Sequence, residues 1–260
     1  MEVIIKPHSQ AVSKEAIRYF ETQLETKPAS VFGLATGRTP LELYGELAAL
    51  ARADLIDFSR ATTFNLDEYV GLAGDHPGSY QHYMRENLFL KINLPAASAH
   101  MPNGLAPDIE RHCAEYEEAI RRAGGIDLQL LGLGTDGHIG FNEPTSSLSS
   151  RTRLKTLTPR TIKDNAHHFP SEADVPRHVI TMGIGTIMEA RQILVLAIGE
   201  VKAAAVAMTV EGPITADCPA SILQMHRKCI LIVDEAAASG LKRRDYYRWI
   251  YEHKPPWQRI

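Results

Sequence analysis

The chain has 260 residues, of which 44% are hydrophobic and 23% are charged, and its formal net charge at pH 7 is −3. A globular chain of this size buries enough surface to fold without a disulfide or a structural metal. The slightly acidic balance argues against a general nucleic-acid or anionic-membrane binder, so any anionic ligand must be held locally.

The cysteines and the hydropathy pattern exclude further classes. Cys113, Cys218 and Cys229 are odd in number and widely spaced, which argues against a disulfide scaffold or a zinc motif. No apolar stretch approaches the roughly 18 residues of a membrane span. We therefore expect a cytoplasmic protein with neither a membrane nor a nucleic acid as partner.

Short aliphatic runs alternate along the chain with longer segments of helical periodicity. Strands are predicted near 2–5, 30–35, 61–66, 127–133, 178–182, 192–198 and 229–233. Helices are predicted over 10–26, 40–52, 79–90, 108–123, 200–210 and 239–252. Runs such as QLLGLG and ILVLAI are apolar throughout, which indicates burial on both faces. The alternation predicts an α/β fold, a doubly wound and mostly parallel sheet with helices on both faces.

Residues 134–177 form the least regular stretch and are rich in Gly, Ser, Thr, Pro and His. A connection of this length inside a compact domain is usually a lid or a binding loop. We expect one domain over residues 1–260, with a lid or regulatory segment within 134–177.

Polar residues collect where the predicted strands end, and in open parallel sheets ligands bind beyond those ends. Strand 30–35 runs into Thr36, Gly37, Arg38 and Thr39, just before a predicted helix. Backbone N–H groups, hydroxyls and a helix N-terminus are together suited to hold a phosphate. The alternative is a plain glycine-containing turn.

Strand 61–66 is followed by the paired carboxylates Asp67 and Glu68. Mutual repulsion and partial burial raise a carboxyl pKa toward the working pH, as proton transfer requires. The alternative is that Asp67 caps the next segment and Glu68 is solvated.

The densest cluster is LGLGTDGHIGFNEP, which places Asp136, His138 and Glu143 after a buried strand. A histidine flanked by carboxylates has the parts of a general acid/base. A divalent-metal site and a solvated glycine-rich turn are the alternatives, and the lack of a second nearby histidine disfavours the metal. Lys202 follows strand 192–198 at the same sheet edge, near the start of a helix, and is suited to an anion, although a surface role is the usual one for lysine.

Three segments carry a resemblance to a known family. TFNLDEYVGL, LGLGTDGHIGFNEPTSSLSSRTRLKTLT and GEVKAAAVAMTVEG resemble the glucosamine-6-phosphate deaminase family, over essentially the whole chain. The resemblance implies a modified doubly wound, Rossmann-like fold. It also implies conversion of glucosamine 6-phosphate and water to fructose 6-phosphate and ammonia, without an organic cofactor or catalytic metal. We expect such an enzyme to be classed as a hydrolase of an aminosugar phosphate.

The family pattern assigns roles residue by residue. Asp67 is the implied base for the C2 proton, and His138, oriented by Asp136 and Glu143, is the implied catalyst of pyranose ring opening. The same pattern places the phosphate on residues 36–39 and Lys202.

Two departures from the pattern concern the phosphate. Arg38 stands where the family usually has a small residue, and His167 stands where it has an arginine. We expect Arg38 to supply the lost cation, because a guanidinium pairs with phosphate bidentately whereas histidine is only partly charged at neutral pH. The choice between glucosamine and galactosamine 6-phosphate stays open.

A basic stretch resembles the effector site of the hexameric members that N-acetylglucosamine 6-phosphate activates. Ser146, Arg153, Lys155 and Thr156 match that pattern. The resemblance implies a homo-oligomer, with the hexamer as one expected form. A structural use of this segment, for example at a subunit contact, is the alternative.

Two other functions stay open on the same scaffold. The related 6-phosphogluconolactonases share the Asp-Gly-His region but depart from this chain at GFNEP. A non-catalytic sugar-phosphate sensor is the remaining alternative.

Overall fold

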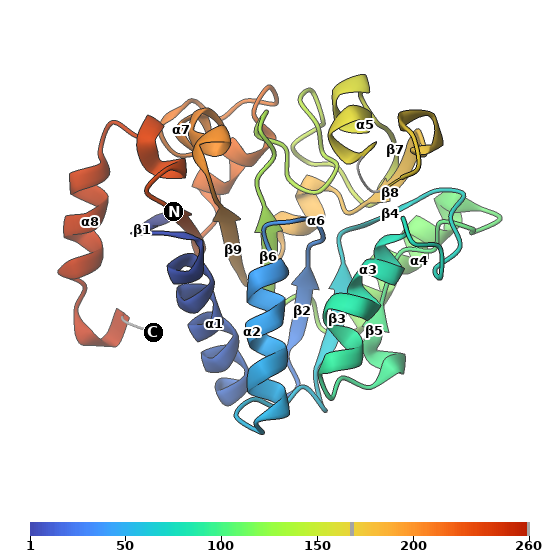
Figure 1. The fold of residues 1–260 in the computed structure, drawn as a ribbon, viewed down its shortest axis with the longest axis horizontal. Coiled ribbons are helices and arrows are strands. Elements are labelled where there is room, and N and C mark those ends of the chain that lie inside the picture. The colour runs from blue at the N-terminus through green and yellow to red at the C-terminus, as the bar shows by residue number, and fades with distance from the viewer. Residues whose placement is uncertain (167–168, 259–260) are drawn as a thin grey trace.

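A seven-stranded parallel sheet forms the centre of the computed structural model, which describes residues 1–166 and 169–258. The strand order is β1-β10-β9-β6-β2-β3-β5 (Figure 1). The strands are β1 (Glu2–Lys6), β2 (Val31–Leu34), β3 (Thr62–Asn65), β5 (Ala99–His100), β6 (Leu128–Gly132), β9 (Gln192–Ala197) and β10 (Cys229–Asp234). Strand order reverses between β2 and β6, because the chain runs outward from β2 to β5 and then returns to the other side of β2. Ligands of doubly wound sheets bind at such a point.

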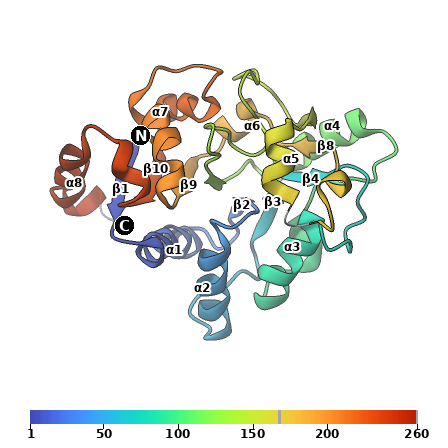
Figure 2. The same cartoon turned by 45° about the horizontal axis from the view of Figure 1, so that its top comes forward.

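Helices cover both faces of this sheet (Figure 2). One face carries α1 (Ser9–Thr26), α2 (Leu41–Arg52) and α3 (Tyr80–Asn87), and the other carries α4 (Ile109–Arg122), α6 (Ile184–Met188) and α7 (Ala203–Glu211). In β10, Ile230 and Ile232 pack on the first face and Leu231 and Val233 on the second. The prediction of continuous apolar strands buried on both sides is thereby confirmed.

A second, antiparallel sheet has the order β4-β8-β7. It consists of β4 (Asp67–Tyr69), β7 (Arg153–Thr156) and β8 (His178–Thr181). The predicted strand 178–182 is confirmed as β8, but it lies in this sheet and not in the parallel one. Only Leu66 separates β3 from β4, and its N–H donates to Leu34 O in the large sheet while its carbonyl accepts from Met182 N. Asp67 consequently lies at the junction of the two sheets.

The segment 134–177 is more regular than predicted. It contains β7, the helix α5 (Pro159–Asn165) and a 3-10 turn at Glu172–Asp174. Thr158 caps α5 and Pro159 occupies its first turn, a combination that starts helices because proline lacks only an N–H that would be unpaired there. Beneath this segment lies a separate apolar cluster that includes Tyr69, Tyr80 and Phe141.

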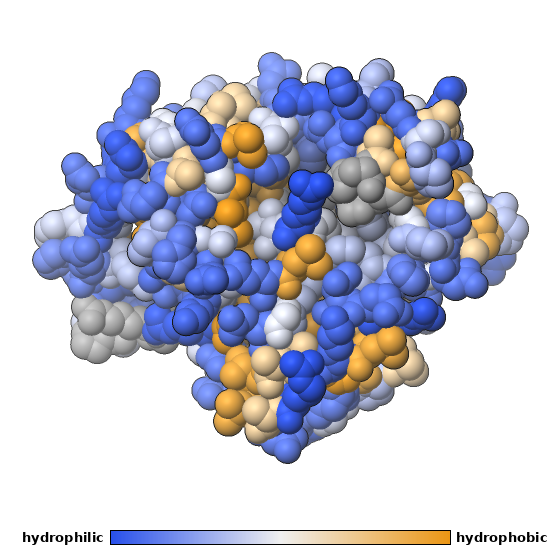
Figure 3. All heavy atoms as spheres, viewed as in Figure 1, coloured by the Kyte–Doolittle hydropathy of each residue, from blue (hydrophilic) through white to orange (hydrophobic). Residues whose placement is uncertain are grey.

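The last helix, α8 (Arg244–Glu252), begins five residues later than predicted, because Ala237–Gly240 forms a 3-10 turn first. The surface in Figure 3 is largely hydrophilic, and hydrophobic residues gather toward its lower end, over α2 and α3. Leu55, which follows α2, and Leu90, which follows α3, are exposed. None of the described helices is long and apolar enough to cross a membrane.

Candidate active site

Segments that follow β2, β3, β6 and β9 meet in one cleft of about 560 Å³. It lies at the carboxyl ends of the parallel strands, beside the point where strand order reverses. Its lining includes the predicted residues Thr36, Gly37, Arg38, Thr39, Asp67, His138 and Lys202. Residues far apart in sequence are thus brought together as predicted from the strand ends. His167 lies outside the described residues.

Asp67 is a buried carboxyl group at the wall of this cleft, with 5% of its surface exposed. Burial, and to a smaller degree the charge of Glu68, raises its pKa to about 8. A carboxylate with such a pKa binds protons far more strongly than an ordinary aspartate. In its ionised form, which becomes the majority only above that pKa, Asp67 therefore has the chemical character of a general base.

Glu68 is held rigidly and is not solvated, so the alternative of a solvated side chain is wrong. Its carboxylate accepts from the backbone N–H groups of Tyr69, Tyr80 and Gln81 at 2.8–3.0 Å, and from Ser79 Oγ at 2.7 Å. Ser79 caps α3, so the carboxylate satisfies N–H groups at a helix N-terminus, where a negative charge is favoured. These bonds fix α3 to the strand that carries Asp67.

His138 is paired with Asp136 in the turn after β6. Asp136 Oδ1 lies 2.6 Å from His138 Nδ1 and also accepts from the His138 backbone N–H at 3.2 Å. Burial alone raises the pKa of Asp136, but the hydrogen bond and charge of His138 outweigh it and lower the pKa to about 2. An ionised Asp136 favours the tautomer with its proton on Nδ1, which leaves Nε2 to exchange a proton with a ligand.

Two glycines permit this turn. Gly137 has a φ of +84°, which L side chains rarely adopt, and a Cβ there would also strike Cys218 Sγ. A Cβ at Gly134 would collide with the imidazole of His138. The glycines of LGLGTDGH thus make room for the histidine ring and for the chain packed behind it.

Glu143 is buried and bonds to the start of α5. Its carboxylate accepts from Thr158 N at 3.2 Å, from Thr158 Oγ1 at 2.9 Å and from Thr161 Oγ1. Among the residues that the structure describes, the hydrogen-bond partners of this carboxylate are Thr161 of α5 and Thr158, the residue that caps α5. The implied role of orienting His138 stays a prediction.

The turn after β2 and Lys202 make the cleft suited to an anion. Gly37 has a φ of +104°, and its carbonyl accepts from Tyr83 Oη at 2.6 Å, which anchors the turn over residues 36–39. Lys202 caps α7 and is partly buried, and burial lowers its pKa, although carboxylates nearby act in the other direction. A cation held out of bulk water in this way binds an anion more strongly than a surface lysine does.

Sequence reasoning missed the contributions of α3 and α5 to the cleft. Tyr80 from α3 and Thr161, Asp164 and Asn165 from α5 also line it. The Thr-Pro start of α5 was the signal that predicts a helix there. No cluster of three or more His, Cys, Asp or Glu side chains suited to a metal occurs in 1–166 or 169–258.

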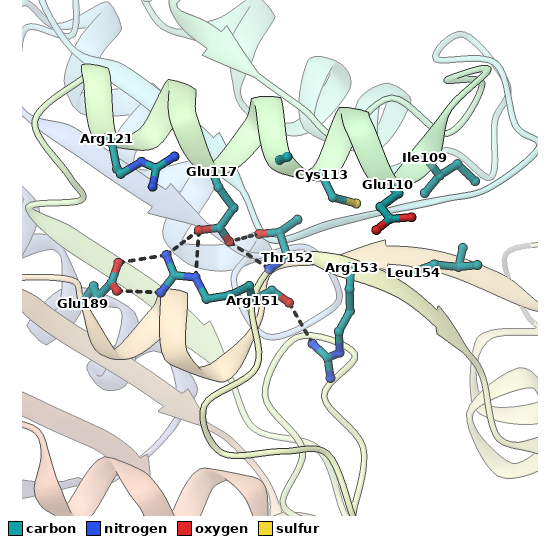
Figure 4. A pocket seen from close by; sticks show the side chains of 11 residues that line it. Ile109, Glu110, Cys113, Glu117, Arg121, Arg151, Thr152, Arg153, Leu154 and Glu189 are labelled. Carbon is teal, nitrogen blue, oxygen red and sulfur yellow. Dashed lines mark hydrogen bonds and ion pairs between the residues drawn. The ribbon is translucent and has the colours of Figure 1, made fainter.

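A second cavity, of about 880 Å³, lies between α4 and β7 (Figure 4). Arg151 reaches between Glu117 of α4 and Glu189 and pairs with both, and Glu117 also accepts from Thr152 N at 2.8 Å. Arg153 is at its edge, but its side chain points away from α4 (Figure 4) and donates to Asn142 Oδ1 at 2.8 Å.

The four predicted effector residues are divided between two positions. Arg153, Lys155 and Thr156 lie on β7, where alternation places Arg153 and Lys155 on one face and Thr156 on the other. Ser146 is 3% exposed, and its buried Oγ has no hydrogen-bond partner among the described residues.

Comparison with known proteins gives close relatives over the full length. The model of the family described as glucosamine-6-phosphate isomerases/6-phosphogluconolactonase matches residues 7–232. A glucosamine-6-phosphate deaminase from Pseudarthrobacter chlorophenolicus is 55% identical over 260 residues, which is 100% of both chains. One from Shewanella woodyi is 52% identical over 250 residues, covering 96% of this chain and 95% of the relative.

Solved structures agree with this assignment. A monomeric glucosamine-6-phosphate deaminase superposes with a TM-score of 0.90 at 42% identity, covering 92% of this chain and 100% of that one. A 6-phosphogluconolactonase from Thermotoga maritima, at 23% identity and a TM-score of 0.69, shares the fold. The expected classification as a hydrolase is wrong, because the relatives are deaminases and the matched family model describes isomerases. The chain belongs to the family of glucosamine-6-phosphate isomerases and 6-phosphogluconolactonases.

Proposed function

We propose that this protein converts glucosamine 6-phosphate and water to fructose 6-phosphate and ammonia. The observation that carries the proposal is the cleft itself, in which a buried Asp67 and an Asp136-paired His138 lie beside an anion pocket. Relatives of the same length at 50–55% identity that are named glucosamine-6-phosphate deaminase support it.

Ring opening comes first, because the cyclic sugar has no carbonyl group to acidify the proton on C2. In this step the ring oxygen gains a proton as its bond to C1 breaks, and the anomeric hydroxyl loses one. We assign the exchange with the ring oxygen to His138 Nε2. Asp136 holds the Nδ1 side of the ring, so the imidazole keeps one orientation and one tautomer during the exchange.

Isomerisation and deamination follow from the open aldose. Asp67 takes the C2 proton, which the C1 carbonyl has made acidic, and a proton is then delivered to C1. The amino group on C2 becomes an iminium, and water adds to it and releases ammonia, leaving the ketone of fructose 6-phosphate. Only ionised Asp67 can accept the proton, and its raised pKa makes it a stronger base than an ordinary aspartate.

In this proposal the phosphate binds at the turn over residues 36–39 and at Lys202. The turn over residues 36–39 offers backbone N–H groups and hydroxyls, and Lys202 offers a partly buried charge. Arg38 is exposed at the rim and adds a guanidinium from the same turn.

Ammonia release is the decisive measurement. We expect release from glucosamine 6-phosphate, with galactosamine 6-phosphate and both unphosphorylated sugars as comparisons and Asp67→Asn as the inactive control. Failure to release ammonia from any of them overturns the proposal. Hydrolysis of 6-phosphogluconolactone instead would assign the protein to the other activity on this scaffold.

We also propose an effector site at Ser146, Arg153, Lys155 and Thr156 for N-acetylglucosamine 6-phosphate. Ser146 Oγ is buried without a hydrogen-bond partner, and the half-buried Arg153 has no carboxylate partner among the described residues, so each has capacity left to bond a ligand. A velocity curve indifferent to this sugar phosphate would remove the site.

Assembly is tested with the same preparation. We expect a cytoplasmic homo-oligomer, with the hexamer as one form, and light scattering gives the mass directly. A mass equal to that of one chain would place this protein with the solved relative that is described as monomeric.

A further inference from the structure

Arg160 is the second residue of α5, the helix whose residues Thr161, Asp164 and Asn165 line the cleft. Its Nη2 donates to Thr135 Oγ1 at 3.0 Å, and Thr135 lines the cleft in the turn that leads to His138. A guanidinium has five N–H donors, and this bond uses one of them. Arg160 is not itself a lining residue, but the contact places its guanidinium beside a hydroxyl that lines the cleft, and most of its donors stay available.

The position of Arg160 is set by buried groups. Glu143 accepts from the backbone N–H and the hydroxyl of Thr158, the residue that caps α5, and Thr161 Oγ1 donates to the same carboxylate. Thr158 Oγ1 in turn accepts from Thr161 N at 3.3 Å. Because Glu143 is 3% exposed, the first turn of α5 is fixed to the GFNEP segment. Arg160 is therefore held near Thr135 by the fold as well as by its own contact.

The positive charges of Arg160 and Lys202 are close enough to affect each other. Burial lowers the pKa of Lys202, and the Arg160 cation adds a smaller effect in the same direction, while Asp136 and Asp164 oppose it. Like charges in proximity destabilise a protein unless an anion lies between them. The Asp164 carboxylate does not serve as that anion for Arg160, since the pair is 4.0 Å apart and both side chains are more than 60% exposed, where ion pairs contribute little.

We propose that Arg160 is a phosphate ligand of the substrate site, which approaches the anion pocket from α5. The identity of that phosphate as the one of a hexosamine 6-phosphate rests on the proposed function. A phosphate dianion fits this place because a guanidinium and an ammonium then share one doubly charged ligand. It would also explain how the chain holds phosphate with histidine at position 167.

The test compares Arg160→Gln with Lys163→Gln, which removes one positive charge from another exposed position of the same helix. Inorganic phosphate is the probe, and its Kd is measured by calorimetry. We expect Arg160→Gln to raise this Kd, and the KM for glucosamine 6-phosphate, roughly 10- to 100-fold. Lys163→Gln should change neither by more than about twofold.

A conservative variant separates charge from geometry. Arg160→Lys keeps the charge but loses the fork of donors, so its Kd should fall between those of the wild type and Arg160→Gln. Thermal unfolding of each variant confirms that it is folded, which we expect because Arg160 is 64% exposed.

The outcomes distinguish this inference from the proposed function. Equal phosphate affinity for Arg160→Gln and Lys163→Gln overturns the role of Arg160, and so does a wild type that binds no phosphate. A wild type that binds phosphate through Arg160 but releases no ammonia overturns the proposed function and supports this inference.

Discussion

Two cavities of this molecule differ in how their charged groups are satisfied. In the larger one, between α4 and β7, Arg151 pairs with Glu117 and Glu189, and Glu117 also takes bonds from Thr152 and Thr186. In the smaller cleft at the strand ends, Asp67 is buried and Lys202 is partly buried, and neither has an ion-pair partner among the described residues.

The comparison shows that the volume of a cavity does not identify the candidate active site. A paired carboxylate has its pKa lowered and does structural work, as at Glu117, where burial acts upward but the bonds from Thr152, Thr186 and Arg151 outweigh it. An unpaired buried carboxylate has its pKa raised and is ready to take a proton, as at Asp67. Substitutions of paired and of unpaired residues give the tests that follow.

Asp67→Asn should have the largest effect. The amide occupies the same volume but cannot accept the C2 proton, so kcat/KM for ammonia release should fall roughly 10³- to 10⁴-fold. Glu117→Gln is the matched change in the other cavity and should leave kcat/KM within about twofold of the wild type. Comparable losses in the two variants would contradict the distinction between the cavities.

His138→Gln should follow closely, with a loss in kcat of roughly 10²- to 10³-fold. Glutamine can still bond to Asp136, so the turn should survive, but it cannot exchange a proton with the ring oxygen. His112→Gln, a histidine in a separate hollow near β5, is the control and should keep its kcat. Full activity of His138→Gln would exclude it from ring opening.

The pH profile depends on the raised pKa of Asp67, which burial and then Glu68 bring to about 8. Because the ionised form is the base, kcat/KM should rise about tenfold per pH unit below that value and level off above it. The folded pKa exceeds the unfolded one, so the folded state holds the proton longer and its stability falls as pH rises between about 4 and 8.

Asp67→Asn checks the same pKa through stability. The variant has no carboxyl group to ionise at this position, so it should lose this part of the pH dependence and be more stable than the wild type above pH 8. Urea unfolding at several pH values measures the difference. Parallel pH dependences for the two proteins would show that the pKa of Asp67 is ordinary.

The sequence predicted the parallel sheet well and the second sheet poorly, for a physical reason. Strands such as β9 and β10 are apolar on both faces. This pattern indicates a strand that is covered on both sides. By contrast β4 (Asp67–Tyr69) and β7 (Arg153–Thr156) are short and polar, and their pairing depends on tertiary contacts with β8. No local pattern specifies such a pairing.

The site shows the same limit. The sequence predicted that Asp67, His138 and Lys202 lie together, because the parallel strands that precede them end at one edge of the sheet. The partners of Glu143 were not predictable, since its bonds reach to α5, 15 to 18 residues further on, across a turn whose path depends on packing. Arg160 was missed for the same reason.

Glu117→Ala should affect stability rather than catalysis. It leaves Thr152 N and two hydroxyls without their acceptor, which costs about 2–3 kcal/mol; the pair with Arg151 adds little because Arg151 is 43% exposed. Glu118→Ala, a change at the next residue, removes only exposed ion pairs with Arg121 and Arg122 and should leave the stability almost unchanged. Denaturant unfolding measures both, and equal costs would contradict the assignment of Glu117 as an anchor.

Arg38→Ala should have the smallest effect, and it tests the anion side of the cleft. Arg38 is exposed, so solvent screens its charge, and we expect the KM for glucosamine 6-phosphate to rise only about tenfold with little change in kcat. Arg60→Ala, an exposed arginine before β3, controls for the loss of one positive charge. A normal KM in Arg38→Ala would mean that Lys202, the backbone of residues 36–39 and the proposed ligand Arg160 hold the phosphate without the Arg38 guanidinium.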